Sequence, residues 1–150
     1  MWFKKIFYLL IVVVVFLVIF FVGFSDSYKY SVEAKIKYTL GNYKDAIELA
    51  QKAFELDPYN KMAFSILAQS KISIKFLDYI DDAKDYLQKI DYISKKNKVT
   101  NIDKIKIKMM TEVMMGRFKK LTPTVLTDKK LYAESKKLYE EFVKIHENLD

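Results

Sequence analysis

The sequence predicts an all-α protein in which an N-terminal transmembrane helix precedes a series of antiparallel helical hairpins. The first observation behind this prediction is an apolar run, residues 6–24, that contains no charged side chain. The second is the scarcity of helix-breaking residues, since the 150-residue chain holds only three glycines and two prolines. So few turn residues favour long helices with short connections over a many-turned β fold.

The apolar run has the length of a membrane-spanning helix. At a rise of about 1.5 Å per residue, a helix over residues 6–24 reaches about 28 Å, close to the roughly 30 Å hydrocarbon thickness of a bilayer. Aromatic side chains flank it on both sides, where interfacial residues are expected: Trp2, Phe3, Tyr8, Tyr28 and Tyr30. We therefore expect residues 1–25 to form an uncleaved signal-anchor that contacts membrane lipid through residues 6–24.

A cleaved signal peptide is the alternative interpretation, with imperfect small-residue cleavage sites at residues 23–27. The apolar core of a signal peptide usually spans only about 7 to 15 residues, which is shorter than this run. Lys4 and Lys5, next to the run, favour a cytoplasmic N-terminus, although further lysines follow the run as well. In that orientation the rest of the chain is exported, and the predicted location is a bacterial inner membrane.

Residues 38–60 carry the clearest motif: the end of one helix, a turn and a second helix. Gly41 lets the backbone leave the first helix, and Pro58 stops the second. Between them, Ala46 and Ala53 stand seven residues apart and form a flat stripe on which another helix can pack closely. Two asparagines occupy the capping positions before the second helix and before the helix that follows it, Asn42 and Asn60.

This motif resembles the second helix of a tetratricopeptide repeat at five positions, Gly41, Tyr43, Ala46, Ala53 and Pro58. The resemblance implies a TPR-like solenoid of about three helical hairpins. Residues 26–60 would be the first repeat, residues 61–95 a degenerate second repeat with a turn at residues 75–82, and residues 96–150 a divergent helical pair or closing cap. A generic helical bundle that contains one Ala-rich helix is the alternative.

Residues 96–150 are predicted to hold two helices, 102–118 and 131–149, joined by a loop around Pro123. The second helix has one apolar stripe that we expect to be buried: Leu131, Ser135, Leu138, Phe142, Ile145 and Leu149. Residues 105–109 alternate like a strand, but the apolar residues that follow return to helical spacing, so we assign a helix there.

The sequence offers little for catalysis or metal binding. It has no cysteine, which excludes disulfides, thiolate zinc sites and cysteine nucleophiles. Its only histidine, His146, lies among polar residues near the C-terminus, and we expect it to be a surface or half-packed side chain. The chain has no glycine-rich phosphate loop and no metalloprotease or calcium-loop motif. We therefore expect no catalytic residue, no metal, no cofactor and no enzyme activity.

The net charge of +7 is concentrated in residues 95–130, which carry eleven Lys and Arg against three acidic residues. A well-solvated helix face is the simplest interpretation. The alternatives are that the segment lies against anionic lipid or meets an acidic partner. The interleaved aromatic residues typical of nucleic-acid binding are not evident, so no nucleic acid is expected.

Together these features predict a membrane-anchored adaptor of the cell envelope, an interaction module that binds a protein or peptide partner. The resemblance implies a concave groove formed by the first helices of successive repeats. In that register the partner-binding residues would be Tyr28, Lys35, Tyr38, Met62, Ser65 and Gln69. Two alternatives remain open: a structural subunit of a larger membrane complex, and a cleaved, secreted repeat protein.

Overall fold

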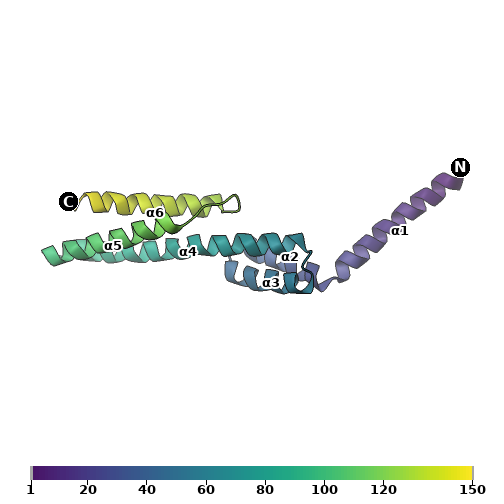
Figure 1. Cartoon of the computed structure of the whole chain (residues 1–150), viewed down its shortest axis with the longest axis horizontal. Helices are drawn as coiled ribbons and strands as arrows, with labels where there is room; N and C mark the ends of the chain where they lie inside the picture. Colours follow the sequence, from purple (N-terminus) through teal and green to yellow (C-terminus); the bar gives the residue numbers. More distant parts are fainter. Residues whose placement is uncertain (1, 150) are drawn as a thin grey trace. The chain divides into compact units, whose positions relative to one another are not determined.

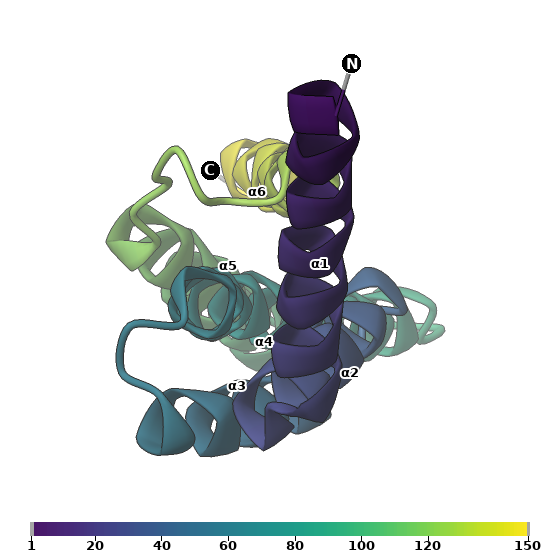
Figure 2. The same ribbon diagram turned by 90° about the vertical axis from the view of Figure 1, so that its right-hand side faces the viewer.

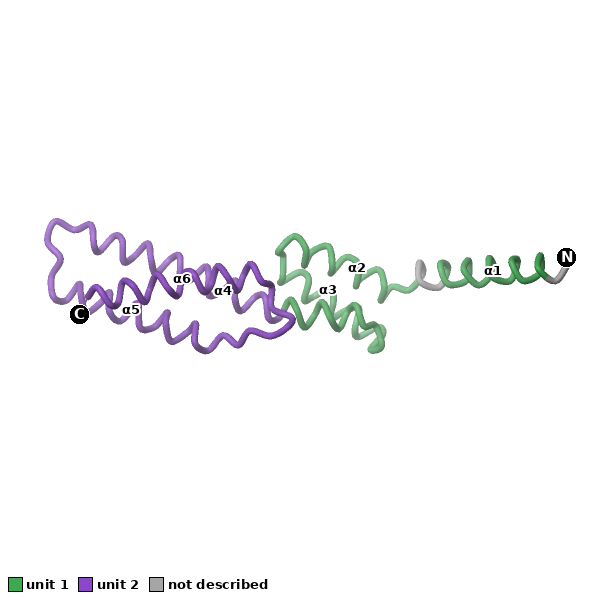
Figure 3. The backbone as a smooth tube through the Cα atoms, turned by 90° about the horizontal axis from the view of Figure 1, so that it is seen from above, with its two compact units in different colours: residues 1–70 green, residues 71–150 purple. Residues whose placement is uncertain are grey.

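The computed structural model describes the backbone of residues 2–149 and the side chains of residues 4–20 and 25–149. Within these residues every regular element is a helix, which confirms the predicted all-α class. The helices, labelled in Figure 1, are α1 (Trp2–Phe24), α2 (Asp26–Thr39), α3 (Tyr43–Leu56), α4 (Lys61–Ser94), α5 (Asn101–Lys120) and α6 (Lys129–Glu147). The chain divides into unit 1, residues 1–70, and unit 2, residues 71–150, which have different colours in Figure 3.

Helix α1 covers the apolar run at the N-terminus, and every side chain from Ile6 to Phe20 is 43 to 69% exposed. The prediction of a transmembrane helix is corrected by the structure. Among the described residues no helix is both long and apolar enough to cross a membrane. The predicted interfacial residues Trp2 and Phe3 have side chains outside the described residues, as have Gly23 and Phe24 of the predicted cleavage sites.

In unit 1, α2 and α3 form an antiparallel hairpin around Gly41 (Figure 1). Gly41 has φ +79°, in the left-handed region that glycine adopts without steric cost. Its N–H donates to Tyr38 O at 3.0 Å, and the N–H of Asn42 donates to Lys37 O at 2.9 Å. These are the two hydrogen bonds of a Schellman motif. The turn predicted at Gly41 is confirmed, and α3 ends shortly before Pro58 as predicted.

Small side chains fill most of the interior of unit 1. The described positions of unit 1 with no exposed surface are Ser31, Ala34, Ala46, Ala50, Ala53, Ala63 and Ser70. Because only a methyl or hydroxymethyl group separates the backbones at these points, the helices can approach closely. The predicted alanine stripe of α3 is therefore confirmed as a packing surface. Larger apolar residues of the same helices lie outside it and are 40 to 75% exposed: Val32, Ile36, Leu40, Leu56 and Phe64.

Asn60 joins the ends of three helices. Its Oδ1 accepts a hydrogen bond from Ala63 N at 3.1 Å and so caps α4, as predicted. Its Nδ2 donates to Ser27 Oγ at 2.9 Å, and Ser27 Oγ donates in turn to Ala53 O at 2.7 Å. One satisfied polar network therefore fixes the start of α2, the end of α3 and the start of α4. The other predicted cap, Asn42, stands before α3, but its side chain makes no capping hydrogen bond.

Helix α4 is continuous from Lys61 to Ser94. The turn predicted at residues 75–82 is therefore wrong, and the predicted solenoid of about three hairpins is corrected with it. Residues 75–82 contain neither glycine nor proline. Buried side chains recur at helical spacing through this segment and beyond it: Ser70, Ser73, Phe76, Tyr79, Ile80 and Ala83. Because one packed face continues without a break, the chain gains nothing by leaving the helix.

Unit 2 packs the second half of α4 against α5 and α6. Its apolar core is made of Tyr79, Ile80, Ala83, Ile90 and Ile93 from α4, Ile107 and Met114 from α5, and Leu138 and Phe142 from α6. The structure confirms both helices predicted for this region to within two residues at each end. It also confirms the predicted stripe of α6, whose members are buried or packed against this core. The loop of residues 121–128 between α5 and α6 is drawn in light green in Figure 2.

A capping box starts α5. Thr100 Oγ1 accepts a hydrogen bond from Asp103 N at 3.2 Å, and Thr100 N donates to Asp103 Oδ2 at 3.1 Å. Lys96 Nζ also donates to Asp103 Oδ1, at 2.8 Å. Lys96 first, and then the backbone and hydroxyl of Thr100, hold the pKa of Asp103 well below its ordinary value of 3.8. The charged form of Asp103 is thus the one that stabilises the fold.

The protein should lose stability in acid through Asp103. A carboxyl whose pKa is lowered on folding contributes stability that is complete above its unfolded pKa, here 3.8, and is lost as the pH falls from there toward the native value. Asp103→Asn should therefore lower the melting temperature at about pH 7 and have a much smaller effect at about pH 2. Circular dichroism melts of both proteins at the two pH values measure this difference.

Asp91→Asn is the control for this experiment, because Asp91 forms an exposed ion pair with Lys95 at 2.6 Å. Such pairs contribute little to stability, so this variant should melt close to the wild-type temperature at both pH values. An equal loss for Asp103→Asn at neutral and acid pH would contradict the assigned role of the Asp103 carboxylate.

Candidate functional site

The structure divides the six residues predicted to bind a partner. Lys35 of α2 and Met62 of α4 line one hollow of about 370 Å³ on the surface of unit 1, which we call the α2 hollow. Tyr28 is 38% exposed on α2 but does not line this hollow. The remaining three residues are half-buried: Tyr38, Ser65 and Gln69.

The three half-buried residues make contacts within unit 1. The Tyr38 ring meets the Tyr43 ring edge-on, with the ring centroids 5.4 Å apart. Gln69 Nε2 donates to Ser65 Oγ at 3.4 Å, one turn away on α4. Each of these three residues thus has a contact within unit 1. The structure therefore does not bring the six predicted residues together in one groove.

Most of the lining of the α2 hollow lies outside the six predicted residues. Val32 and Ile36 of α2 and Leu40, the C-cap residue of α2, stand four residues apart and are 40, 55 and 75% exposed. Together with Thr39 they complete the lining. Their spacing was the available signal, because residues four apart share one face of a helix. The buried residues of α2 are small: Ser27, Ser31 and Ala34.

The α2 hollow offers apolar surface beside one positive charge. Ile36 and Leu40 supply aliphatic area, and Met62 adds a thioether side chain that adapts its shape to a ligand. Among the described residues no carboxylate lies within 4.0 Å of Lys35 Nζ. The neighbouring Lys37, by contrast, pairs with Asp45 at 3.2 Å. The Lys35 ammonium is thus available to an acidic group that enters the hollow.

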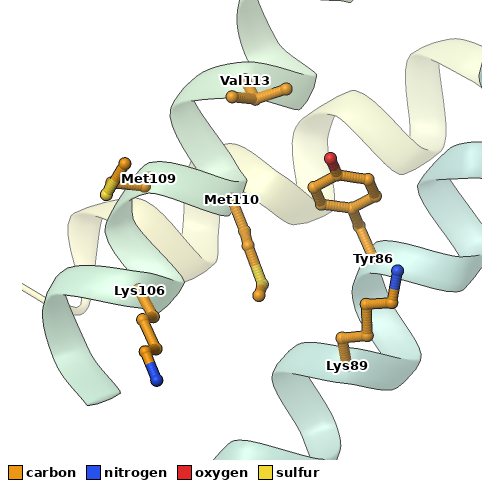
Figure 4. Close-up of a pocket in the computed structure, with 6 residues that line it drawn as sticks. All are labelled: Tyr86, Lys89, Lys106, Met109, Met110 and Val113. Atoms are coloured by element: carbon orange, nitrogen blue, oxygen red, sulfur yellow. The ribbon is translucent and has the colours of Figure 1, made fainter. Parts of the chain in front are cut away.

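A second depression lies in unit 2, between α4 and α5 (Figure 4). It has a volume of about 300 Å³ and is lined by Tyr86 and Lys89 from α4 and by Lys106, Met109, Met110 and Val113 from α5. An adjoining depression of about 400 Å³ shares Lys89, Lys106 and Met110 with it and extends to Asp85, Gln88, Tyr92 and Ile93 of α4. We call the two together the α4–α5 furrow.

The basic segment, residues 95–130, contributes the α5 side of this furrow. Several of its cations are paired, among them Lys96 with Asp103 at 2.8 Å and Arg117 with Asp82 at 2.6 Å. The segment is more than a solvated polar face, because four large apolar residues of α5 are 47 to 66% exposed: Ile102, Ile105, Met109 and Val113. Cations and apolar side chains therefore share the outer surface of α5.

His146 is half-buried, which agrees with the predicted half-packed side chain. Its Nδ1 lies 2.9 Å from Thr111 Oγ1, and Thr111 Oγ1 donates its only proton to Lys108 O at 2.7 Å. The Thr111 hydroxyl thus joins the His146 ring of α6 to the backbone of α5. Among the residues that the structure describes, no three His, Asp or Glu side chains are grouped so that they could hold a metal ion.

The chain matches no family model, and no curated protein or solved structure is significantly similar to it. The resemblance of residues 38–60 to a tetratricopeptide repeat therefore stays a prediction.

Proposed function

We propose that this protein is a non-enzymatic interaction module that binds an apolar helical segment of a protein partner in the α2 hollow. The observation that carries the proposal is the exposure of Val32, Ile36 and Leu40 on a helix whose other side is closely packed. Contiguous exposed apolar surface on a folded domain is typical of an interaction site, whereas single exposed apolar residues need no explanation.

A partner helix suits the geometry of this surface. The apolar side chains of α2 follow one another at intervals of one helical turn, so a helix laid along α2 would meet each of them with residues of its own i, i+4 series. Met62 from α4 forms the second side of the hollow. Lys35 would fix the orientation of the partner through an acidic residue at the edge of its apolar stripe.

Lipid is the environment that we propose for α1. The run Ile6–Phe20 leaves every side chain exposed, an apolar surface far larger than a folded protein leaves in water. Lys4 and Lys5 adjoin this run, where their ammonium groups would meet anionic headgroups. Contact of α1 with lipid would hold the module at a membrane surface. Coverage of α1 by an apolar helix of a larger assembly is the second candidate, favoured by the same exposure.

Ile36→Asp should abolish binding of the partner, because a carboxylate in the middle of the apolar lining would have to be desolvated on binding. The matched control is Leu56→Asp, which changes an equally exposed apolar residue of α3 outside the hollow. Affinity purification in mild detergent, with quantitative mass spectrometry, compares the two variants with the wild type.

The partner is the protein that is retained by the wild type and by Leu56→Asp but falls by about tenfold or more with Ile36→Asp. If both variants retained the same proteins in the same amounts, the α2 hollow would not be the binding site. Circular dichroism verifies that both variants stay folded.

The lipid proposal predicts that the protein floats with phospholipid vesicles in a density gradient and stays bound in high salt, since apolar contacts are not screened. A double variant, Val13→Asp with Phe16→Asp, should remain with the unbound protein. Lipid contact would be contradicted if the wild-type protein stayed unbound at low salt, or if the double variant floated as the wild type does. An apolar helix of a protein partner would then be the remaining candidate to cover α1.

A further inference from the structure

We propose that the α4–α5 furrow is a second docking surface, formed by other residues than the α2 hollow, and that it takes an acidic amphipathic helix of a protein partner. Three features carry this inference: the depression between the two helices, its lining of apolar side chains and lysines with one carboxylate, Asp85, and a lysine with no described carboxylate within 4.0 Å of its Nζ.

The shape of the furrow suits an inserted side chain. Figure 4 shows Met110 and the Tyr86 ring projecting from opposite helices, with Val113 toward one end and the two lysines toward the other. A volume of about 300 Å³ leaves room for one large apolar side chain of a partner. Methionine side chains adapt to the shape of what they contact, so the α5 side can mould itself around a leucine or a phenylalanine.

The charges of the furrow select an acidic partner. Lys89 is engaged already, since its Nζ lies 2.6 Å from Asp85 Oδ2 and 5.3 Å from the centroid of the Tyr86 ring. Lys106 differs, because no described carboxylate lies within 4.0 Å of its Nζ. It belongs to a segment with eleven cations against three acidic residues. A carboxylate next to the inserted side chain would therefore complete an ion pair that the chain itself does not provide.

Other occupants fit these features less well. A second copy of this chain would bring a net charge of +7 against an equal charge, and a symmetric contact through the furrow would set Lys106 close to its own copy. A flat bilayer of anionic lipid would satisfy the lysines and the exposed isoleucines of α5, but it presents no side chain of fixed shape to fill a depression between two helices. An acidic helix satisfies both the charge and the concavity.

Methionine-methyl NMR on the full chain can test this proposal, because the methionines sample both surfaces. Met109 and Met110 line the furrow, Met62 lines the α2 hollow, and Met114 is fully buried. The probe is a synthetic amphipathic helix of about 18 residues with leucines on one face and glutamates beside them, and its counterpart carries lysines in place of the glutamates. The acidic peptide should shift the signals of Met109 and Met110 and leave those of Met62 and Met114 in place.

Charge reversal then tests the role assigned to Lys106. Lys106→Glu should lower the affinity for the acidic peptide by about tenfold or more and allow the lysine peptide to bind. Lys98→Glu is the matched control, because it makes the same charge change in the same basic segment but outside the lining. It should change the affinity by no more than about twofold at physiological salt.

Four outcomes would overturn the proposal. The acidic peptide fails to bind, or it shifts Met62 and so occupies the α2 hollow. Lys98→Glu weakens binding as much as Lys106→Glu does, so that only net charge matters. Finally, vesicles of phosphatidylglycerol shift Met109 and Met110 while the peptide does not, and the surface then belongs to lipid. None of these results depends on whether Ile36→Asp affects partner binding at the α2 hollow.

Discussion

Close packing of small side chains is the constraint on which the surface of unit 1 depends. Ala34 of α2 lies in one buried cluster with Ala46 and Ala50 of α3 and Ile66 of α4. Only methyl groups of α2 and α3 meet in this cluster, so a larger side chain at position 34 would crowd α3. The larger apolar residues of α2 are therefore left on its outer side, where Ile36 and Leu40 are more than half exposed. The close packing of the α2–α3 hairpin that stabilises unit 1 thus also produces the apolar surface of unit 1.

Unit 2 also exposes apolar side chains, although its core consists of large side chains instead of small ones. Its interior is filled by large side chains such as Tyr79, Met114 and Phe142, all nearly or fully buried. Helix α5 packs only one side into this core, so Met109 and Val113 stay exposed beside lysines. Both units therefore present apolar surface next to an ammonium group, the chemistry that recognises apolar segments flanked by acidic residues. The two docking surfaces that we propose would let one chain bind two partner segments, as the proposed interaction module requires.

Local signals predicted the elements well, and the failures lie where burial decides. Gly41 and Asn60 mark a turn and a cap through the conformations and hydrogen bonds of single residues, and both predictions are confirmed. The turn predicted at residues 75–82 came from family analogy, and the continuous packed face of α4 overrides it. The lining of the α2 hollow was missed because the exposed side of α2 depends on which of its residues α3 covers. The four-residue spacing of Val32, Ile36 and Leu40 indicates that they share a face, but tertiary packing decides which face of α2 is covered by α3.

The central claim, that close packing turns the large apolar residues of α2 outward, can be measured by thiol labelling. The chain has no cysteine, so one introduced thiol reports on one position. The matched pair is Ile36→Cys, at a position 55% exposed, and Ala34→Cys, at a fully buried position of the same helix. In the native protein the thiol at position 36 should react with a maleimide nearly as fast as in urea. In the native protein the thiol at position 34 should react at least about a hundredfold more slowly than the thiol at position 36, because only opening of the structure exposes it. Similar native rates at the two positions would contradict the account.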